Sequence, residues 1–175
     1  MPGSHAETCQ IAAIVFDRNE DSYAPLEEFL DRLAERGVRV AGLVQEREDC
    51  EGCDGKDLWV RNLTTGRRFA IMQDLGASSE SCRVDPSAIA VAARELGEAV
   101  KARPDLVVAN RFGRLESEGE GMIAEIGEAV AEGVALMIAV PLRYLEAWNA
   151  FAGGLDRQLP PRLEAMEAWW DDVGA

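Results

Sequence analysis

Two apolar runs near the N-terminus, with one amphipathic segment between them, constrain the fold of this chain more than any other feature. Residues 11–16 form an uninterrupted apolar run of strand length, and residues 24–36 carry leucine and phenylalanine at helical spacing. Gly37 follows where a helix-ending glycine is expected, and residues 38–44 form a second, mostly apolar run. This order predicts a β-α-β unit with a right-handed crossover, and therefore a mainly parallel sheet.

The middle of the chain is expected to add an antiparallel hairpin to this sheet. Segments 56–63 and 67–73 alternate apolar and polar residues on either side of Gly66, which is typical of two strands joined by a glycine turn. A helix is then predicted to begin at Asp85 and Pro86, because an aspartate N-cap followed by proline starts helices well, and to run to about residue 103.

Further strand and helix segments complete the predicted fold. The expected strands are 106–109 and 134–140, and the expected helices are 120–132, 142–152 and one that starts after residue 160. We therefore predict a three-layer α/β domain with a mainly parallel sheet, formed by residues 9–175. Residues 1–8 are expected to be disordered or tag-like.

The charge of the chain limits its partners. It has 18 lysine and arginine residues against 32 aspartate and glutamate residues, a formal net charge of −14. Such a surface repels nucleic-acid phosphates and anionic bilayers, so we expect neither nucleic acid nor a membrane as a partner. No apolar run approaches the roughly 18 residues of a membrane span, and no signal-peptide pattern is present, which favours a cytoplasmic protein.

The cysteines give only weak candidates for a metal site. Cys50 and Cys53 have the spacing of half a zinc site or of a redox pair, and Cys82 could join them. A structural zinc site needs four ligands, and no second pair of this spacing exists. The alternative interpretation is that all of these are ordinary reduced thiols in loops.

Candidate ligand-binding residues follow the strand expected to be central. Asn110, Arg111 and Arg114 come directly after the apolar run 106–109. Ligands of open α/β sheets bind beyond the carboxyl ends of the strands, so this position favours a site. The alternative is that both arginines pair on the surface with nearby glutamates, of which Glu116 is one.

A second group of candidates lies in a serine-rich loop. Ser78, Ser79, Ser81 and Arg83 could offer hydroxyls, backbone N–H groups and one guanidinium to a tetrahedral oxyanion. The alternative is a loop without a ligand. Asp17, at the end of the first strand, is either a helix-entry residue or a ligand for a cation or a hydroxyl.

Five segments, spread between residues 11 and 161, resemble an uncharacterised bacterial family of about this length. They read GVRVAGLVQ, DLWVRNLTTGRRFAI, QDLGASSESCRVDP, NRFGRLESEG and VPLRYLEAWNAFAGG. Genes of that family often lie beside molybdate ABC-transporter genes, and some members are labelled as molybdenum-transporter ATP-binding proteins. The resemblance implies a link to molybdenum homeostasis.

The family in turn resembles small P-loop nucleoside-triphosphatases that have lost their phosphate-binding loop. The pattern G-x-x-x-x-G-K-[ST] is absent, and residues 17–23 read DRNEDSY, whose three carboxylates would repel a triphosphate. Asn110 takes the place of the acidic residue that serves magnesium or water in such enzymes. The resemblance therefore implies a P-loop-hydrolase-like fold without ordinary ATP hydrolysis.

Three functions are consistent with these observations. The first is a non-enzymatic binding protein for a small oxyanion, with molybdate or tungstate implied by the resemblance. The second is a residual nucleotide-binding or nucleoside-triphosphatase activity that depends on magnesium, Asp17 and Glu116. The third is an adaptor in metal-cofactor assembly or transport that meets a protein partner through its acidic surface and the segment 169–170. The sequence leaves the oligomeric state open, a homodimer included.

Overall fold

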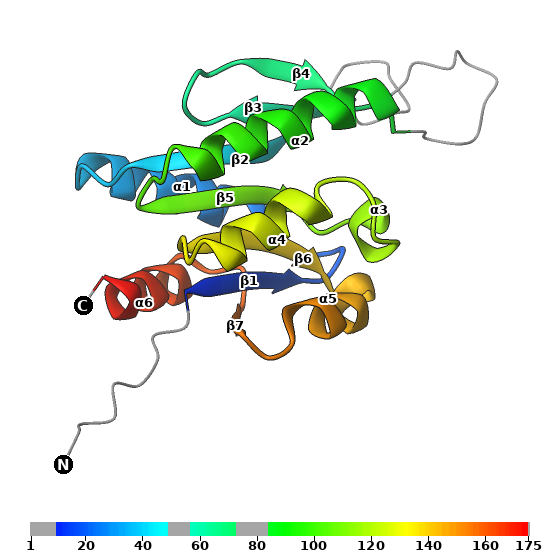
Figure 1. The fold of residues 1–175 in the computed structure, drawn as a ribbon. Coiled ribbons are helices and arrows are strands. Elements are labelled where there is room, and N and C mark those ends of the chain that lie inside the picture. The colour runs from blue at the N-terminus through cyan, green and yellow to red at the C-terminus, as the bar shows by residue number, and fades with distance from the viewer. Residues whose placement is uncertain (1–9, 49–56, 73–83, 175) are drawn as a thin grey trace.

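The described part of the computed structural model comprises residues 10–48, 57–72 and 84–174. It contains one seven-stranded sheet in the order β4-β3-β2-β5-β6-β1-β7 (Figure 1). Five strands run parallel to one another: β1 (Ile11–Phe16), β2 (Val40–Glu48), β5 (Leu106–Arg111), β6 (Leu136–Pro141) and β7 (Asp156–Leu159). The predicted mainly parallel α/β fold is confirmed.

The predicted hairpin is also confirmed. It consists of β3 (Asp57–Asn62) and β4 (Arg68–Ala70), and β3 pairs antiparallel with both β2 and β4. Gly66 lies in the turn with φ +72°, a conformation that glycine adopts without strain. The hairpin therefore extends the sheet at its β2 side.

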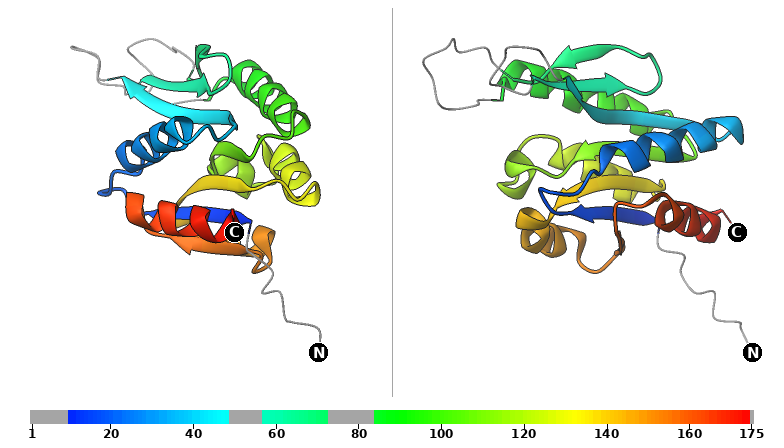
Figure 2. Two further views of the ribbon diagram at one scale, coloured as in Figure 1. Left: turned by 90° about the vertical axis from the view of Figure 1, so that its left-hand side faces the viewer. Right: turned by 180° about the vertical axis from the view of Figure 1, so that it is seen from behind.

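Helices cover both faces of the sheet, as the end-on view shows (Figure 2). On one face lie α1 (Tyr23–Glu35) and α6 (Leu163–Val173), and on the other lie α2 (Pro86–Lys101), α4 (Ile123–Ala131) and α5 (Leu145–Ala152). Each face has its own apolar cluster, with fully buried Phe29 and Trp169 in the first and Leu96 and Trp148 in the second. Burial of these large side chains on both faces stabilises the three-layer arrangement.

The helix boundaries follow the local signals in the sequence. Asp85 caps α2, since its side chain accepts a hydrogen bond of 2.8 Å from the Ser87 amide, and Pro86 fills the first helical position. Gly37 follows α1 with φ +72°. The predicted helix at 120–132 is shorter than expected, because its first residues belong to a turn between α3 (Arg114–Ser117) and α4.

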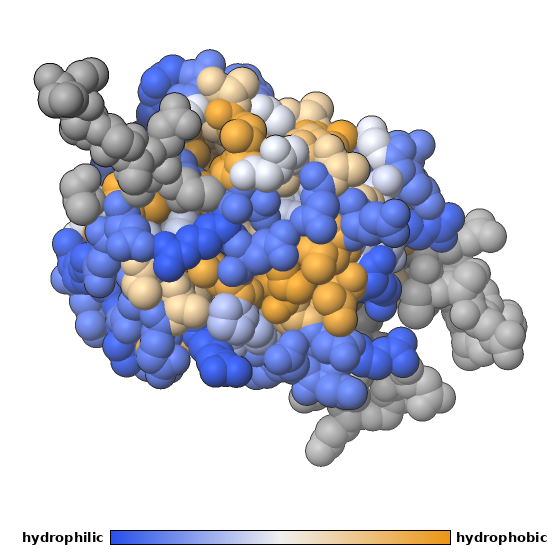
Figure 3. Space-filling view, turned by 90° about the horizontal axis from the view of Figure 1, so that it is seen from below, coloured by the Kyte–Doolittle hydropathy of each residue, from blue (hydrophilic) through white to orange (hydrophobic). Residues whose placement is uncertain are grey.

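The sequence did not predict β7. Its four residues are mostly polar, so it has no apolar run, and it pairs only with β1 at the edge of the sheet. Short, charged edge strands of this kind discourage pairing with other chains. Seen from the β7 side, an apolar area lies among hydrophilic residues (Figure 3). Phe151 and Leu155, which precede this strand, are 38% and 63% exposed.

The carboxyl ends of β5 and β6 lead into two short helical turns. These are α3, after β5, and the 3-10 turn η1 (Leu142–Tyr144), after β6. Within the described residues, none of the helices has both the length and the apolar character needed to cross a membrane.

Candidate functional site

A β-bulge near the end of β5 places Asn110 in an unusual position. The parallel pairing of β5 with β6 is regular at Val107 and Val108 and is shifted at Arg111. Asn110 has φ +52°, in the left-handed region that asparagine tolerates better than most residues, and it is 7% exposed. The sequence placed Asn110 after the strand, whereas it lies inside it. Bulges re-aim side chains beside functional sites, and this one directs Asn110 to a pocket.

The neighbouring strand β2 makes room for this stretch of β5 with a glycine. Gly42 has φ +117°, and a Cβ atom added there would lie 2.1 Å from the carbonyl oxygen of Val108. Any larger residue would force β2 and β5 apart. The close approach therefore belongs to the same local geometry that orients Asn110.

The pocket lies at the carboxyl end of β5, beside Gln45 of β2, and has a volume of about 230 Å³. Its polar side chains come from β2, β5, α3 and η1, and they include one carboxylate: Gln45, Asn110, Arg111, Arg114, Glu116, Arg143 and Tyr144. The Oδ1 atom of Asn110 is buried and has no hydrogen-bond partner among the described residues. A buried acceptor without a partner costs free energy, so its presence in a pocket wall favours a ligand group that donates a hydrogen bond.

Two guanidinium groups of the pocket have no carboxylate partner among the residues that the structure describes. Arg111 lies over the ring of Phe16 at 5.5 Å, and Arg143 lies over the ring of Tyr144 at 5.0 Å. Neither is in an ion pair with a described residue, although the chain is strongly acidic overall. These contacts leave their N–H donors available to an anion.

Arg114 behaves as the surface-pair alternative expected. Its Nε atom donates to Glu118 at 3.0 Å, one helical turn away, and its side chain is 78% exposed. The hydrogen bond to Glu118 is the main reason why the pKa of Arg114 is raised. Of the three predicted residues that line the pocket, Arg114 is therefore the least available to a ligand.

Glu116 has a structural task that the sequence did not reveal. It is 7% exposed, and its two carboxylate oxygens accept hydrogen bonds from the amides of Gly113 at 2.9 Å and Met122 at 3.0 Å. A Cβ atom added at Gly121 would lie 2.3 Å from the same carboxylate. Glu116 thus braces the turn from β5 to α4, with one backbone hydrogen bond to each of its oxygens.

The loop between β1 and α1 uses its own carboxylates to satisfy its amides. The Asp17 amide donates to Glu20 at 2.8 Å, and the Arg18 amide donates to Asp17 at 2.7 Å. The amides of Tyr23 and Ala24, at the start of α1, both donate to Asp21. These amides would hold phosphate in a phosphate-binding loop, and here they are occupied. Asp17 is exposed and does not line the pocket.

Several pocket residues were missed at the sequence level. Gln45 is 5% exposed, and its Nε2 atom donates to the hydroxyl of Tyr23 at 3.0 Å, which links β2 to α1 across the edge of the sheet. Arg143 and Tyr144 belong to η1, directly after β6. The same signal that selected Asn110, a polar residue after an apolar run, marks Gln45 and Arg143.

The remaining predicted site residues lie outside the described part of the chain. These are Ser78, Ser79, Ser81 and Arg83 of the serine-rich loop, and Cys50, Cys53 and Cys82 of the proposed metal site. Met72 and Val84, which flank the serine-rich loop, form an antiparallel bridge, and both line the pocket. Within the described ranges, no group of three metal-ligating side chains is brought together.

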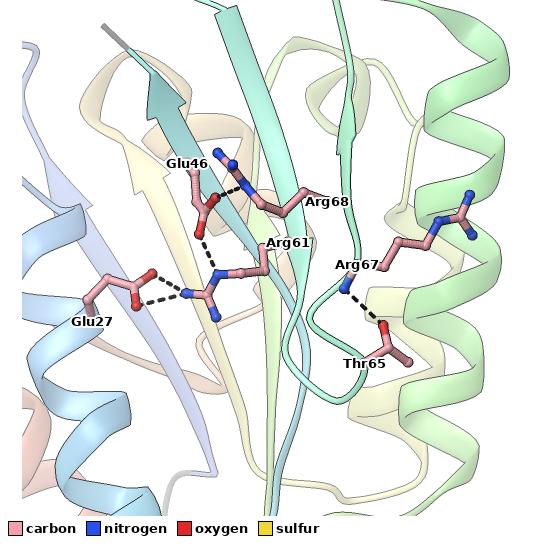
Figure 4. A network of polar contacts seen from close by, with 6 residues as sticks. All are labelled: Glu27, Glu46, Arg61, Thr65, Arg67 and Arg68. Carbon is pink, nitrogen blue, oxygen red and sulfur yellow. Dashed lines mark hydrogen bonds and ion pairs between the residues drawn. The ribbon is translucent and has the colours of Figure 1, made fainter.

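The arginines of the hairpin serve a different purpose. Arg61 binds both carboxylate oxygens of Glu27 at 2.7 and 2.8 Å and also donates to Glu46, which accepts from Arg68 at 2.6 Å (Figure 4). Burial acts to raise the pKa of Glu46, but the bonds from Arg61 and Arg68 outweigh it and lower that pKa. Arg67 pairs with a carboxylate of α2 at 3.0 Å. These groups hold the hairpin to α1 and α2.

The arrangement of sheet and helices is similar to that of a solved nucleoside triphosphatase. The solved "Solution Structure of a Human Cancer-Related Nucleoside Triphosphatase" matches with a TM-score of 0.64, and the match covers 93% of this chain and 95% of that one. At 15% sequence identity, this likeness concerns the fold.

The amino-acid sequence assigns the chain to a family. It belongs to the family described as "Protein of unknown function (DUF2478)", which matches residues 11–169. It is also 33% identical over 167 residues to "Molybdenum import ATP-binding protein ModC 2" of Bradyrhizobium diazoefficiens, a match that covers 95% of this chain and 18% of that relative. The chain therefore spans less than a fifth of the relative's length. These findings confirm the expected relation to an uncharacterised family and to the nucleoside-triphosphatase fold.

Proposed function

We propose that the protein binds a small oxyanion in the pocket at the carboxyl edge of the sheet and does not catalyse a reaction of it. The observation that carries this proposal is that the guanidinium groups of Arg111 and Arg143 line one pocket and have no carboxylate partner in the described chain. Asparagine offers two N–H donors besides its oxygen, and each guanidinium offers five. Two cations suit a dianion.

The charge distribution supports a local site. With a net charge of −14, the chain as a whole repels anions, so an anion is held only where cations lie close to it. Arg111 and Arg143 meet that condition from two different elements, since Arg111 is the last residue of β5 and Arg143 lies in η1 after β6. Charge-assisted hydrogen bonds from guanidinium are among the strongest that proteins make to oxyanions.

Molybdate or tungstate is the anion that we propose. The support comes from the relative, which is named as a molybdenum import ATP-binding protein and of which this chain matches 18%. In this proposal the protein acts in molybdenum homeostasis as a carrier or sensor of the anion.

Nucleotide binding is the second candidate, favoured by the nucleoside-triphosphatase fold. The geometry gives it less support, because the amides of the β1–α1 loop are occupied by Glu20 and Asp21. Each oxygen of Glu116 already accepts a backbone hydrogen bond that holds the turn after β5. A nucleotide would have to displace carboxylates that are already well placed.

Isothermal calorimetry tests the proposal. The protein is titrated with molybdate, tungstate, sulfate and magnesium-ATP, and the titrations are repeated with an Arg111→Gln, Arg143→Gln double variant. Arg36→Gln is the control, because Arg36 is an exposed residue that pairs with Asp171 in α6, away from the pocket. We expect the unchanged protein to bind molybdate or tungstate, and the double variant to bind it about 100-fold more weakly. Each tenfold loss of affinity corresponds to about 1.4 kcal/mol of binding free energy.

Three results would contradict this proposal. Equal binding by the double variant and by the Arg36→Gln control would remove the pocket as the site. Magnesium-dependent binding of ATP, without binding of the inorganic anions, would favour the nucleotide candidate. Binding of none of the four ligands would leave an adaptor that acts through a protein partner.

A further inference from the structure

The pocket has an apolar half that a bare oxyanion does not use. Its apolar residues come from β3, from the two ends of the serine-rich loop, and from α2, α3 and the start of α4: Leu58, Ile71, Met72, Val84, Ile89, Leu115 and Met122. Leu58, Met72 and Ile89 are only partly buried, and Val84 is 36% exposed. Partly exposed apolar side chains that face one pocket favour an apolar contact there.

We propose that the oxyanion bound at Asn110, Arg111 and Arg143 is joined to a flat organic ring, aromatic or heteroaromatic, that packs against Leu58 and Ile89. This inference rests on the proposed function, because the cationic side of the pocket must hold the anionic group. The two halves lie in one pocket but come from different elements. Sites for organic ligands combine apolar walls with a few placed polar groups in this way.

Asn110 supplies an independent argument for the organic part. Molybdate, tungstate and sulfate are dianions without a hydrogen to donate at neutral pH, so none of them can satisfy the buried Oδ1 acceptor. A ring N–H or a hydroxyl group can donate to it. An organic anion that carries such a donor therefore accounts for the orphan acceptor and for the apolar wall together, whereas a bare oxyanion accounts for neither.

The size of the pocket limits the ligand. Its volume of about 230 Å³ is below the usual range of about 300–1,000 Å³ for sites that enclose drug-sized molecules. A single ring with one anionic group suits this space better than a nucleoside triphosphate does. The ligand class is thus a small aryl or heteroaryl oxyanion, and an aryl phosphate is the simplest probe of its ring contact alone.

The test compares phenyl phosphate with inorganic phosphate and with molybdate by calorimetry at about pH 8, above the second pKa of phosphate. The wall variant is Ile89→Ala, in the first turn of α2. The matched control is Ile123→Ala, because Ile123 is also a partly buried helical isoleucine but does not line the pocket. Thermal unfolding of both variants checks that they fold.

We expect phenyl phosphate to bind at least about tenfold more tightly than phosphate. Ile89→Ala should remove most of that ratio, and Ile123→Ala should keep it. Equal affinities for phosphate and phenyl phosphate, or a ratio that both variants keep, would overturn the inference while anion binding itself stands. If the protein binds phenyl phosphate but neither phosphate nor molybdate, the ring contact is supported and the proposal that the protein carries a bare oxyanion is overturned. Silence with all three probes would overturn both.

Discussion

The substitution Glu116→Gln is expected to loosen the turn that follows β5. The carboxylate of Glu116 is 7% exposed and accepts one backbone hydrogen bond on each oxygen, from Gly113 and from Met122. A glutamine keeps one acceptor and turns an N–H group toward the other amide, which leaves that amide unsatisfied. Since a hydrogen bond to a charged group contributes about 1.5–3 kcal/mol and an unsatisfied buried donor adds a penalty, we expect a loss of about 2–4 kcal/mol.

Glu118→Gln is the matched control for this substitution. Glu118 lies two residues away, is 49% exposed, and pairs only with exposed Arg114 one turn earlier. Exposed pairs of this spacing contribute about 0.3–0.5 kcal/mol, so this variant should unfold almost like the unchanged protein. Urea titration at about pH 7 measures both, with stability read from the midpoint at an unchanged slope.

Similar losses in the two variants, within about 0.5 kcal/mol of each other, would refute the reasoning. Such a result would mean that the carboxylate of Glu116 is not committed to the two amides. It would then be available for other chemistry, the magnesium-dependent activity of the nucleotide candidate included. A large loss confined to Glu116→Gln would support the bracing role that the contacts indicate.

Three further predictions follow from single positions. Gly42→Ala should lower the free energy of unfolding by about 3 kcal/mol or more, because the backbone is strained at φ +117° and the new Cβ atom would lie 2.1 Å from a carbonyl oxygen. Gly37→Ala has open space around it and should lose only about 1–2 kcal/mol in the same urea titration. Equal losses in the two variants would contradict this prediction. Glu46→Gln should destabilise the protein above about pH 4.5, because a carboxyl group with a lowered pKa contributes stability only while it is ionised. The difference in unfolding free energy between the variant and the unchanged protein should shrink as pH falls through the lowered pKa of Glu46. A difference that is constant with pH would contradict this prediction. Asn110→Gly should keep the left-handed backbone and change the free energy of unfolding by less than about 1 kcal/mol. The same variant should bind the anion about tenfold more weakly in calorimetry. An unchanged affinity would remove Asn110 from the site.

The elements with local signals could be predicted from the sequence. The apolar run 11–16, the helix that Gly37 follows and the cap at Asp85 each depend on residues within a few positions of one another, and the structure has all three. The hairpin around Gly66 is of the same kind. The strand β7 escaped because a short polar edge strand is defined by its pairing with β1 rather than by its own pattern.

The candidate site was only partly predictable, for a related reason. Asn110 could be selected as a polar residue after an apolar run, but its bulge depends on the pairing of β5 with β6 and on the approach of Gly42 in β2. Gln45 comes from β2 and Arg143 from η1, and they meet Asn110 only in the folded protein. Conversely, the arginines of the hairpin cluster in sequence, yet Arg61 is bound to two carboxylates.

The location of a bound anion tests the central claim most directly. Crystals of the protein soaked with tungstate, which scatters anomalously, would show the position of tungsten without any assumption about contacts. We expect one strong anomalous peak in the pocket, placed so that the oxygens around the tungsten can accept hydrogen bonds from Asn110, Arg111 and Arg143. A peak at the loop between β1 and α1, or an empty pocket in a crystal that binds tungstate elsewhere, would contradict the account.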